Sequence, residues 1–116
     1  MKKKIENLYN EITFELYVGG LIDKVLDFEV ICDKNDLDVY GYTIVDTNTR
    51  EAEKIFINEL TFYDIEDKRE CEYEIIKTIV HEIAHQNVVK KTLKHSKSFY
   101  KEYNKLFNHL IFKGVI

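Results

Sequence analysis

The spacing of apolar residues predicts a helix at the start of the chain. Four of them recur three or four positions apart, which places them on one face of a helix. They are Ile5, Leu8, Ile12 and Leu16. The pair Gly19–Gly20 follows and is expected to end this helix.

Three runs rich in β-branched and aromatic residues then predict strands, at residues 27–32, 39–45 and 54–60. Polar segments at 33–38 and 46–53 separate the runs and predict loops. Both connections are shorter than the dozen or more residues that a parallel crossover needs. The sequence therefore predicts a small three-stranded antiparallel sheet.

Helical spacing returns in the second half of the chain, over residues 68–89 and again from Ser98 to Phe112. The predicted order is an N-terminal helix, three strands, and two further helices gathered on one face of the sheet. This is an α+β architecture. No proline, repeat or low-complexity segment interrupts the chain, so residues 1–116 are expected to form a single domain.

Composition narrows the class of protein. Hydrophobic residues make up 45% of the chain and charged residues 33%, which is typical of globular proteins and argues against disorder. No apolar run approaches the roughly 20 residues that span a bilayer. Cys32 and Cys71 form no CxxC pair, which argues against a zinc ribbon or a disulfide framework. We expect both cysteines to be small buried side chains, and we expect a cytoplasmic protein.

Charge is distributed unevenly along the chain. Residues 23–74 carry 16 acidic and 6 basic side chains, whereas residues 86–116 carry seven lysines and the single acidic residue Glu102. A basic segment can attract nucleic acid or acidic substrates, although solvated lysines on a helix face are the more common explanation. Both interpretations stay open at this point.

The stretch "HEIAH" carries the most specific chemistry of the sequence. His81 and His85 are four residues apart, so on a helix their rings lie on one face, one turn apart. Two imidazoles at that spacing can bind one zinc ion. Glu82 is rotated by about 100° from His81, so it borders the metal and can accept a proton from water there.

A catalytic zinc ion needs a third protein ligand. His95 is the natural candidate, because the residues after His85 suffice to end one helix, turn and begin the next. We expect His109, which has no such partners, to be a surface residue. Tyr103 is expected to be part of the core, by its spacing.

The run "HEIAH", followed by "HSKSFYKEYNKL" from His95 onwards, resembles the SprT-like metallopeptidases and the related YgjP-like proteins. The upstream run "KIFINELTF" is similar to the last strand before the motif helix in that family. The resemblance implies that His81, His85 and His95 bind zinc and that Glu82 is the general base. Ser96 stands where SprT-like relatives usually have glycine, which is closer to the YgjP-like pattern, and no cysteine-rich zinc ribbon follows.

The resemblance implies a compact zincin-like peptidase that hydrolyses peptide bonds and acts on DNA-associated proteins, with DNA as a candidate partner of the basic C-terminal segment. Two alternatives remain: a catalytically silent metal-binding module, and a nucleic-acid-binding module that uses the lysines. We expect a peptide substrate to add to an exposed strand at residues 53–60. Tyr100 and Lys97 are candidates to stabilise the oxyanion.

Overall fold

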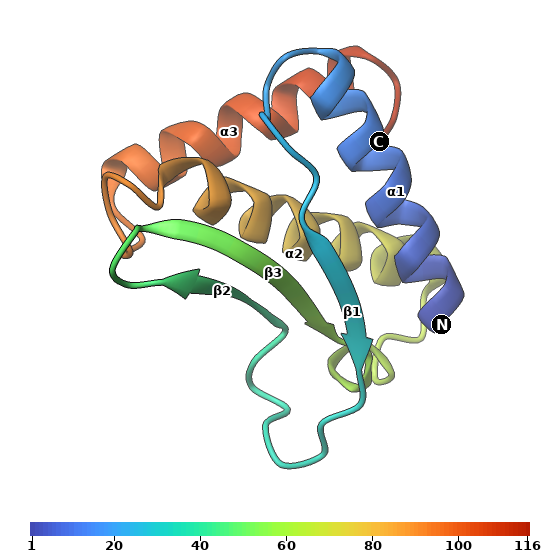
Figure 1. The fold of residues 1–116 in the computed structure, drawn as a ribbon. Coiled ribbons are helices and arrows are strands. Elements are labelled where there is room, and N and C mark those ends of the chain that lie inside the picture. The colour runs from blue at the N-terminus through green and yellow to red at the C-terminus, as the bar shows by residue number, and fades with distance from the viewer.

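The computed structural model describes all 116 residues and contains a three-stranded sheet with two helices packed on one face and a third helix packed against those two (Figure 1). Along the chain the elements are α1 (Lys2–Val18), β1 (Asp27–Ile31), β2 (Gly41–Asp46), β3 (Glu51–Asn58), the 3-10 turn η1 (Glu59–Phe62), α2 (Lys68–Val88) and α3 (Lys97–Phe112). The predicted α+β class and element order are confirmed. No helix has both the length and the apolar character needed to cross a bilayer.

The sheet is mixed, so the prediction of a purely antiparallel sheet is wrong. β3 lies in the centre, with β1 parallel to it on one side and β2 antiparallel to it on the other. The prediction treated strands that follow each other in the sequence as neighbours. The path from β1 to β3, residues 32–50, includes β2 and is long enough for a parallel return.

Asn58, buried at the end of β3, explains how the chain crosses from β1 to the far edge of the sheet. Its side-chain oxygen accepts a hydrogen bond from the Asp33 amide at 3.0 Å. Its side-chain nitrogen donates to the carbonyl oxygens of Asp33 and Asp36, at 3.1 and 3.2 Å. These bonds hold the loop after β1 against the end of β3, and the chain then enters β2 on the other side.

The order of the strands also corrects the prediction of an exposed strand at residues 53–60. Most of that segment is β3, which has a neighbour on each side, and Glu59 and Leu60 belong to η1. β2 pairs only with β3, so its other edge is free. The hairpin between them is tighter than predicted, because Asp46 accepts the Arg50 amide at 2.8 Å and β3 begins at Glu51.

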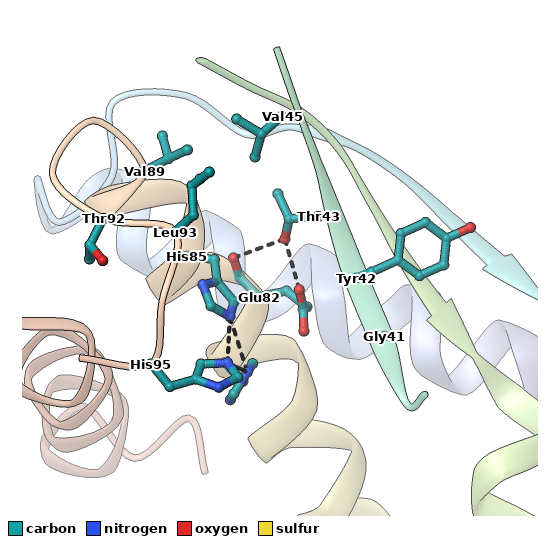
Figure 2. Close-up of a pocket in the computed structure, with 11 residues that line it drawn as sticks. Gly41, Tyr42, Thr43, Val45, Glu82, His85, Val89, Thr92, Leu93 and His95 are labelled. Atoms are coloured by element: carbon teal, nitrogen blue, oxygen red, sulfur yellow. Dashed lines mark hydrogen bonds between the residues drawn. The ribbon is translucent and has the colours of Figure 1, made fainter. Parts of the chain in front are cut away.

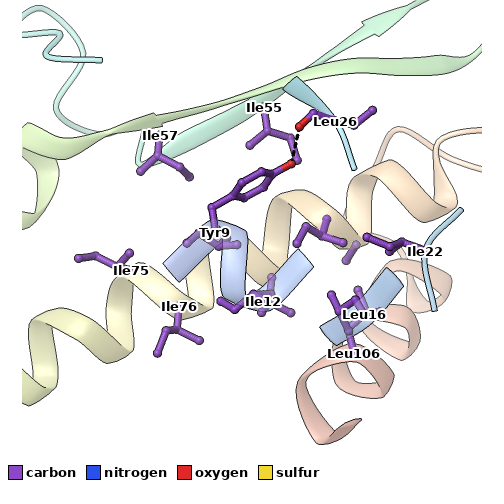
Figure 3. Close-up of a cluster of buried hydrophobic side chains, with 14 of the residues drawn as sticks. Tyr9, Ile12, Leu16, Ile22, Leu26, Ile55, Ile57, Ile75, Ile76 and Leu106 are labelled. Atoms are coloured by element: carbon purple, nitrogen blue, oxygen red, sulfur yellow. Dashed lines mark hydrogen bonds between the residues drawn. The ribbon is translucent and has the colours of Figure 1, made fainter. Parts of the chain in front are cut away.

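The core lies between the sheet and the helices and consists of one cluster of 22 buried hydrophobic residues (Figure 3). Tyr9 of α1 spans this core. Its ring stacks on Phe28 of β1 with centroids 3.9 Å apart, and its hydroxyl donates to the Leu26 carbonyl at 2.8 Å. Packing of α1 against β1 therefore gives the Tyr9 hydroxyl, the one polar group that this large side chain brings into the core, a hydrogen-bond partner.

Side-chain caps define where the last two helices begin. The Asp67 carboxylate accepts the Glu70 amide at 2.9 Å at the start of α2. The Ser96 hydroxyl accepts the Phe99 amide at 3.4 Å at the start of α3. The second cap matters for the site, because it fixes the direction of the chain one residue after His95.

Candidate metal centre

Helix α2 supplies two of the three histidines. It stays helical through both His81 and His85, so their rings lie on one face, and their Nε2 atoms are 3.2 Å apart. The neighbouring residues Ile83 and Ala84 are fully buried against the core, which fixes the rotation of the helix about its axis. Packing of the apolar face therefore aims both imidazoles at the same point.

His95 comes from the segment between α2 and α3 and completes the cluster. Its Nε2 atom lies 2.9 Å from that of His85 and 3.0 Å from that of His81. Figure 2 shows the His85 and His95 rings pointing toward each other across the end of α2. The structure thus brings together three residues that the sequence proposed as zinc ligands.

Phe99, the third residue of α3, packs against all three imidazoles. Its ring centroid lies 4.8 Å from that of His81, 4.4 Å from that of His85 and 5.0 Å from that of His95. Phe99 is completely buried. The first turn of α3 therefore supplies an apolar support that holds the rings in place, and this links the folding of α3 to the geometry of the site.

The chemistry of these donors fits a metal ion such as zinc. Burial lowers the pKa of His81, and burial together with the neighbouring imidazoles His81 and His95 lowers the pKa of His85 to about 4. Both rings are therefore neutral at pH 7, the form that binds metals. Nitrogen ligands about 2.0–2.1 Å from a tetrahedral zinc ion lie about 3.3 Å apart. The three Nε2 atoms, 2.9–3.2 Å apart, match that arrangement closely.

Glu82 lies beside the cluster and is 4% exposed. Burial raises the pKa of its carboxyl group to about 7, and a hydrogen bond from Thr43 opposes this rise. The Thr43 hydroxyl donates to Glu82 Oε1 at 2.8 Å (Figure 2). A carboxyl group whose pKa lies near neutrality can both accept and release a proton at pH 7.

The sequence interpretation did not identify Thr43. It lies in β2, the strand at the edge of the sheet, and its hydroxyl is also 3.3 Å from the main-chain carbonyl oxygen of Glu82. Successive side chains of a strand point to opposite faces of the sheet. Tyr42 stacks on Phe56 on the face away from the helices, so Thr43, the next residue, faces the helices. This alternation is the feature of the sequence that points to Thr43.

Thr43→Val is expected to lower kcat for the hydrolysis proposed below by about 10–100-fold, because a hydrogen bond to a charged group contributes about 1.5–3 kcal/mol. KM and zinc content should change little, since valine has nearly the same shape and the Thr43 hydroxyl donates to Glu82, not to a histidine. Thr43→Ser should restore most of the rate. Equal kcat values for Thr43→Val and the wild type would show that this hydroxyl does not position Glu82.

Other sequence expectations about side chains have different outcomes. Tyr103 is half-buried and packs against the core, as expected, and it also lines an adjoining cavity. Neither Tyr100 nor Lys97 lines the cavity at the histidines, and their role at the oxyanion stays a prediction. His109 is not a surface residue: it packs between α3 and α1, with Nε2 3.6 Å from a Glu15 carboxylate oxygen. Cys32 is exposed rather than buried, and its thiol donates to the Glu59 carboxylate.

Comparisons with protein-family models, with curated proteins and with solved structures found no match. The resemblance to the SprT-like and YgjP-like families therefore depends on the residues of this chain alone, and so does the assignment of a function.

Proposed function

We propose that this protein is a zinc-dependent metallopeptidase of the compact zincin-like type. The observation that carries the proposal is the convergence of three imidazole nitrogens within 3.2 Å of one another, beside a buried glutamate. Three histidines leave a coordination position open, which is typical of catalytic zinc, whereas structural zinc sites are usually closed and rich in cysteine.

Zinc bound at the three nitrogens would lower the pKa of a water molecule and polarise a substrate carbonyl. Glu82 then accepts the proton of the attacking water and delivers it to the leaving amine. Thr43 holds one carboxylate oxygen of Glu82, so the other oxygen is free to face the water. Tyr103 lines the cavity next to His81 and Glu82, and burial raises the pKa of its hydroxyl, which therefore stays protonated and able to donate to a developing oxyanion.

A purified, zinc-loaded sample is expected to cleave an unfolded protein substrate, and removal of the metal should stop the reaction. The measurement is the appearance of peptide fragments, followed by mass spectrometry, before and after treatment with a zinc chelator. Restoring zinc should restore cleavage, because the lowered pKa values of His81 and His85 keep both imidazoles neutral at pH 7, the form that binds metals. If the loaded protein binds zinc and cleaves no peptide or protein, the silent metal-binding module becomes the better assignment.

A second candidate function, binding of nucleic acid, is favoured by the placement of the lysines. All four lysines near His95 in the sequence are exposed: Lys90, Lys91 and Lys94 lie in the segment that joins α2 to α3, and Lys97 is the first residue of α3. Such a surface would bring DNA, or proteins bound to DNA, close to the metal centre.

DNA affinity is expected to fall steeply as the salt concentration rises, because phosphate contacts release condensed counterions. Changing Lys90, Lys91 and Lys94 together to glutamate should weaken binding for every DNA sequence tested. The same triple change at Lys2, Lys3 and Lys4, which lie at the start of α1, is the matched control. Absence of binding by the wild type at low salt would leave these lysines as a solvated surface.

A further inference from the structure

Two cavities meet at the candidate metal centre. One, of about 460 Å³, is lined by the three histidines, by Glu82 and by β2. The other, also of about 460 Å³, extends from the same place toward the start of β2 and is lined by residues that include Tyr103. Both are lined by Gly41, His81 and Glu82, so the two cavities are the halves of one groove with the histidines near its middle.

The groove follows one face of α2. The helix residues that line it follow the i, i+3, i+4, i+7, i+8, i+11 and i+15 positions of one helix face, from Glu74 at one end to Val89 at the other. At 1.5 Å per helical residue, this separation corresponds to a groove of about 22 Å. An extended chain advances about 3.3 Å per residue, so the groove has room for about six residues of a peptide.

The other wall of the groove is β2, which has no partner on its outer edge. A free strand edge presents main-chain amide and carbonyl groups that can pair with another extended chain. Because Thr43 of this strand reaches Glu82, a peptide paired with β2 would pass directly over the general base. The groove therefore fits an extended main chain better than a compact small molecule.

The two halves of the groove differ in chemistry. Beyond His85 the lining includes three aliphatic side chains: Val45 of β2, Val89 at the end of α2, and Leu93 of the following segment. The opposite half has one aliphatic side chain, Val39, together with Tyr40 and Tyr103. It also carries three charged side chains, Asp38, Glu74 and Lys77, of which the last two form an ion pair at 2.7 Å. The half-groove beyond His85 therefore offers more aliphatic surface and no charged carboxylate or ammonium group beyond Glu82, so it suits an aliphatic side chain of a bound peptide better than the opposite half does.

We infer that the substrate is an extended peptide segment with an aliphatic residue beside the cleaved bond, and that this residue occupies the half-groove of Val45, Val89 and Leu93. The inference rests on the proposed peptidase function and adds the substrate class to it. Leu93 is 49% exposed, so a large part of its surface is available to be covered by such a side chain.

The test uses binding, not turnover, so it does not depend on cleavage. Zinc-loaded Glu82→Gln protein is titrated into fluorescently labelled Gly/Ser-rich octapeptides that carry a single leucine or a single aspartate, and anisotropy is measured. Burial of a leucine side chain contributes about 1.5–3 kcal/mol, so the leucine peptide should bind at least about 10-fold more tightly. Adding Leu93→Asn should remove most of this preference, whereas Leu37→Asn, at a leucine of similar exposure (54%) outside the groove, should keep it.

Equal affinity for the two peptides would overturn the inference, and so would a preference that survives Leu93→Asn as well as it survives Leu37→Asn. Circular dichroism and zinc content, measured on both variants, show whether the fold and the metal centre are intact. If leucine selectivity is found but the wild type cleaves nothing, the hydrolysis proposed above fails while the peptide-binding groove stands. The two failures are therefore distinguishable.

Discussion

Replacing Glu82 by glutamine is expected to slow peptide hydrolysis by about 10²–10⁴-fold, the usual contribution of a general acid–base group. Glutamine has the size of glutamate and can still accept a hydrogen bond from Thr43 through its amide oxygen. It lacks the basicity needed to take a proton from water. Since the imidazoles of His81 and His85 are untouched, zinc content and folding should stay close to those of the wild type.

The matched control for this variant is Glu59→Gln. Glu59 is also a buried glutamate, 8% exposed, and accepts a hydrogen bond from a neighbouring side chain, the Cys32 thiol. It lies in η1 and lines neither half of the groove. The control should hydrolyse peptides at nearly the wild-type rate. If Glu82→Gln and Glu59→Gln are equally active, Glu82 is not the general base and the mechanism is wrong.

The part of the site that lies within one helix could be predicted from the sequence. The spacing of His81 and His85 fixes their relative position wherever α2 is helical, and the apolar face of α2 fixes which way they point. His95 was a candidate because the residues after His85 leave room for a turn and a second helix, but its position could not be predicted, because the path of a connecting segment does not follow from its residue types. Its position is decided by the Ser96 cap and by Phe99, which packs against all three rings.

The order of the strands could not be predicted by the same reasoning. Loop length limits which strands can pair, but it does not decide which of them do. Here the order of the strands depends on the side chain of Asn58, which binds the loop after β1. Its partners, Asp33 and Asp36, lie 25 and 22 residues earlier in the chain. The contact between Thr43 and Glu82 joins residues 39 positions apart, and it follows only once β2 is known to be the edge strand.

His95→Ala is expected to weaken zinc binding by more than about 10²-fold. Losing a residue that only orients a metal ligand typically costs 10–100-fold in affinity, and here a ligand itself is removed. Wild-type protein should bind about one zinc ion per chain, because its three clustered histidines form a single site. The measurement is titration with zinc in competition with a chelator of known affinity.

The His95→Ala variant is expected to lose a metal ligand and to keep its fold. His95 is exposed and precedes α3, so alanine at this position removes the imidazole without opening a cavity in the core. His109→Gln is the matched control, because His109 is the one histidine outside the cluster and its ring packs between α1 and α3. The control should bind zinc as the wild type does, even if its thermal stability falls. Should His95→Ala bind zinc as tightly as His109→Gln, His95 is not the third ligand and the metal must be held by another set of donors.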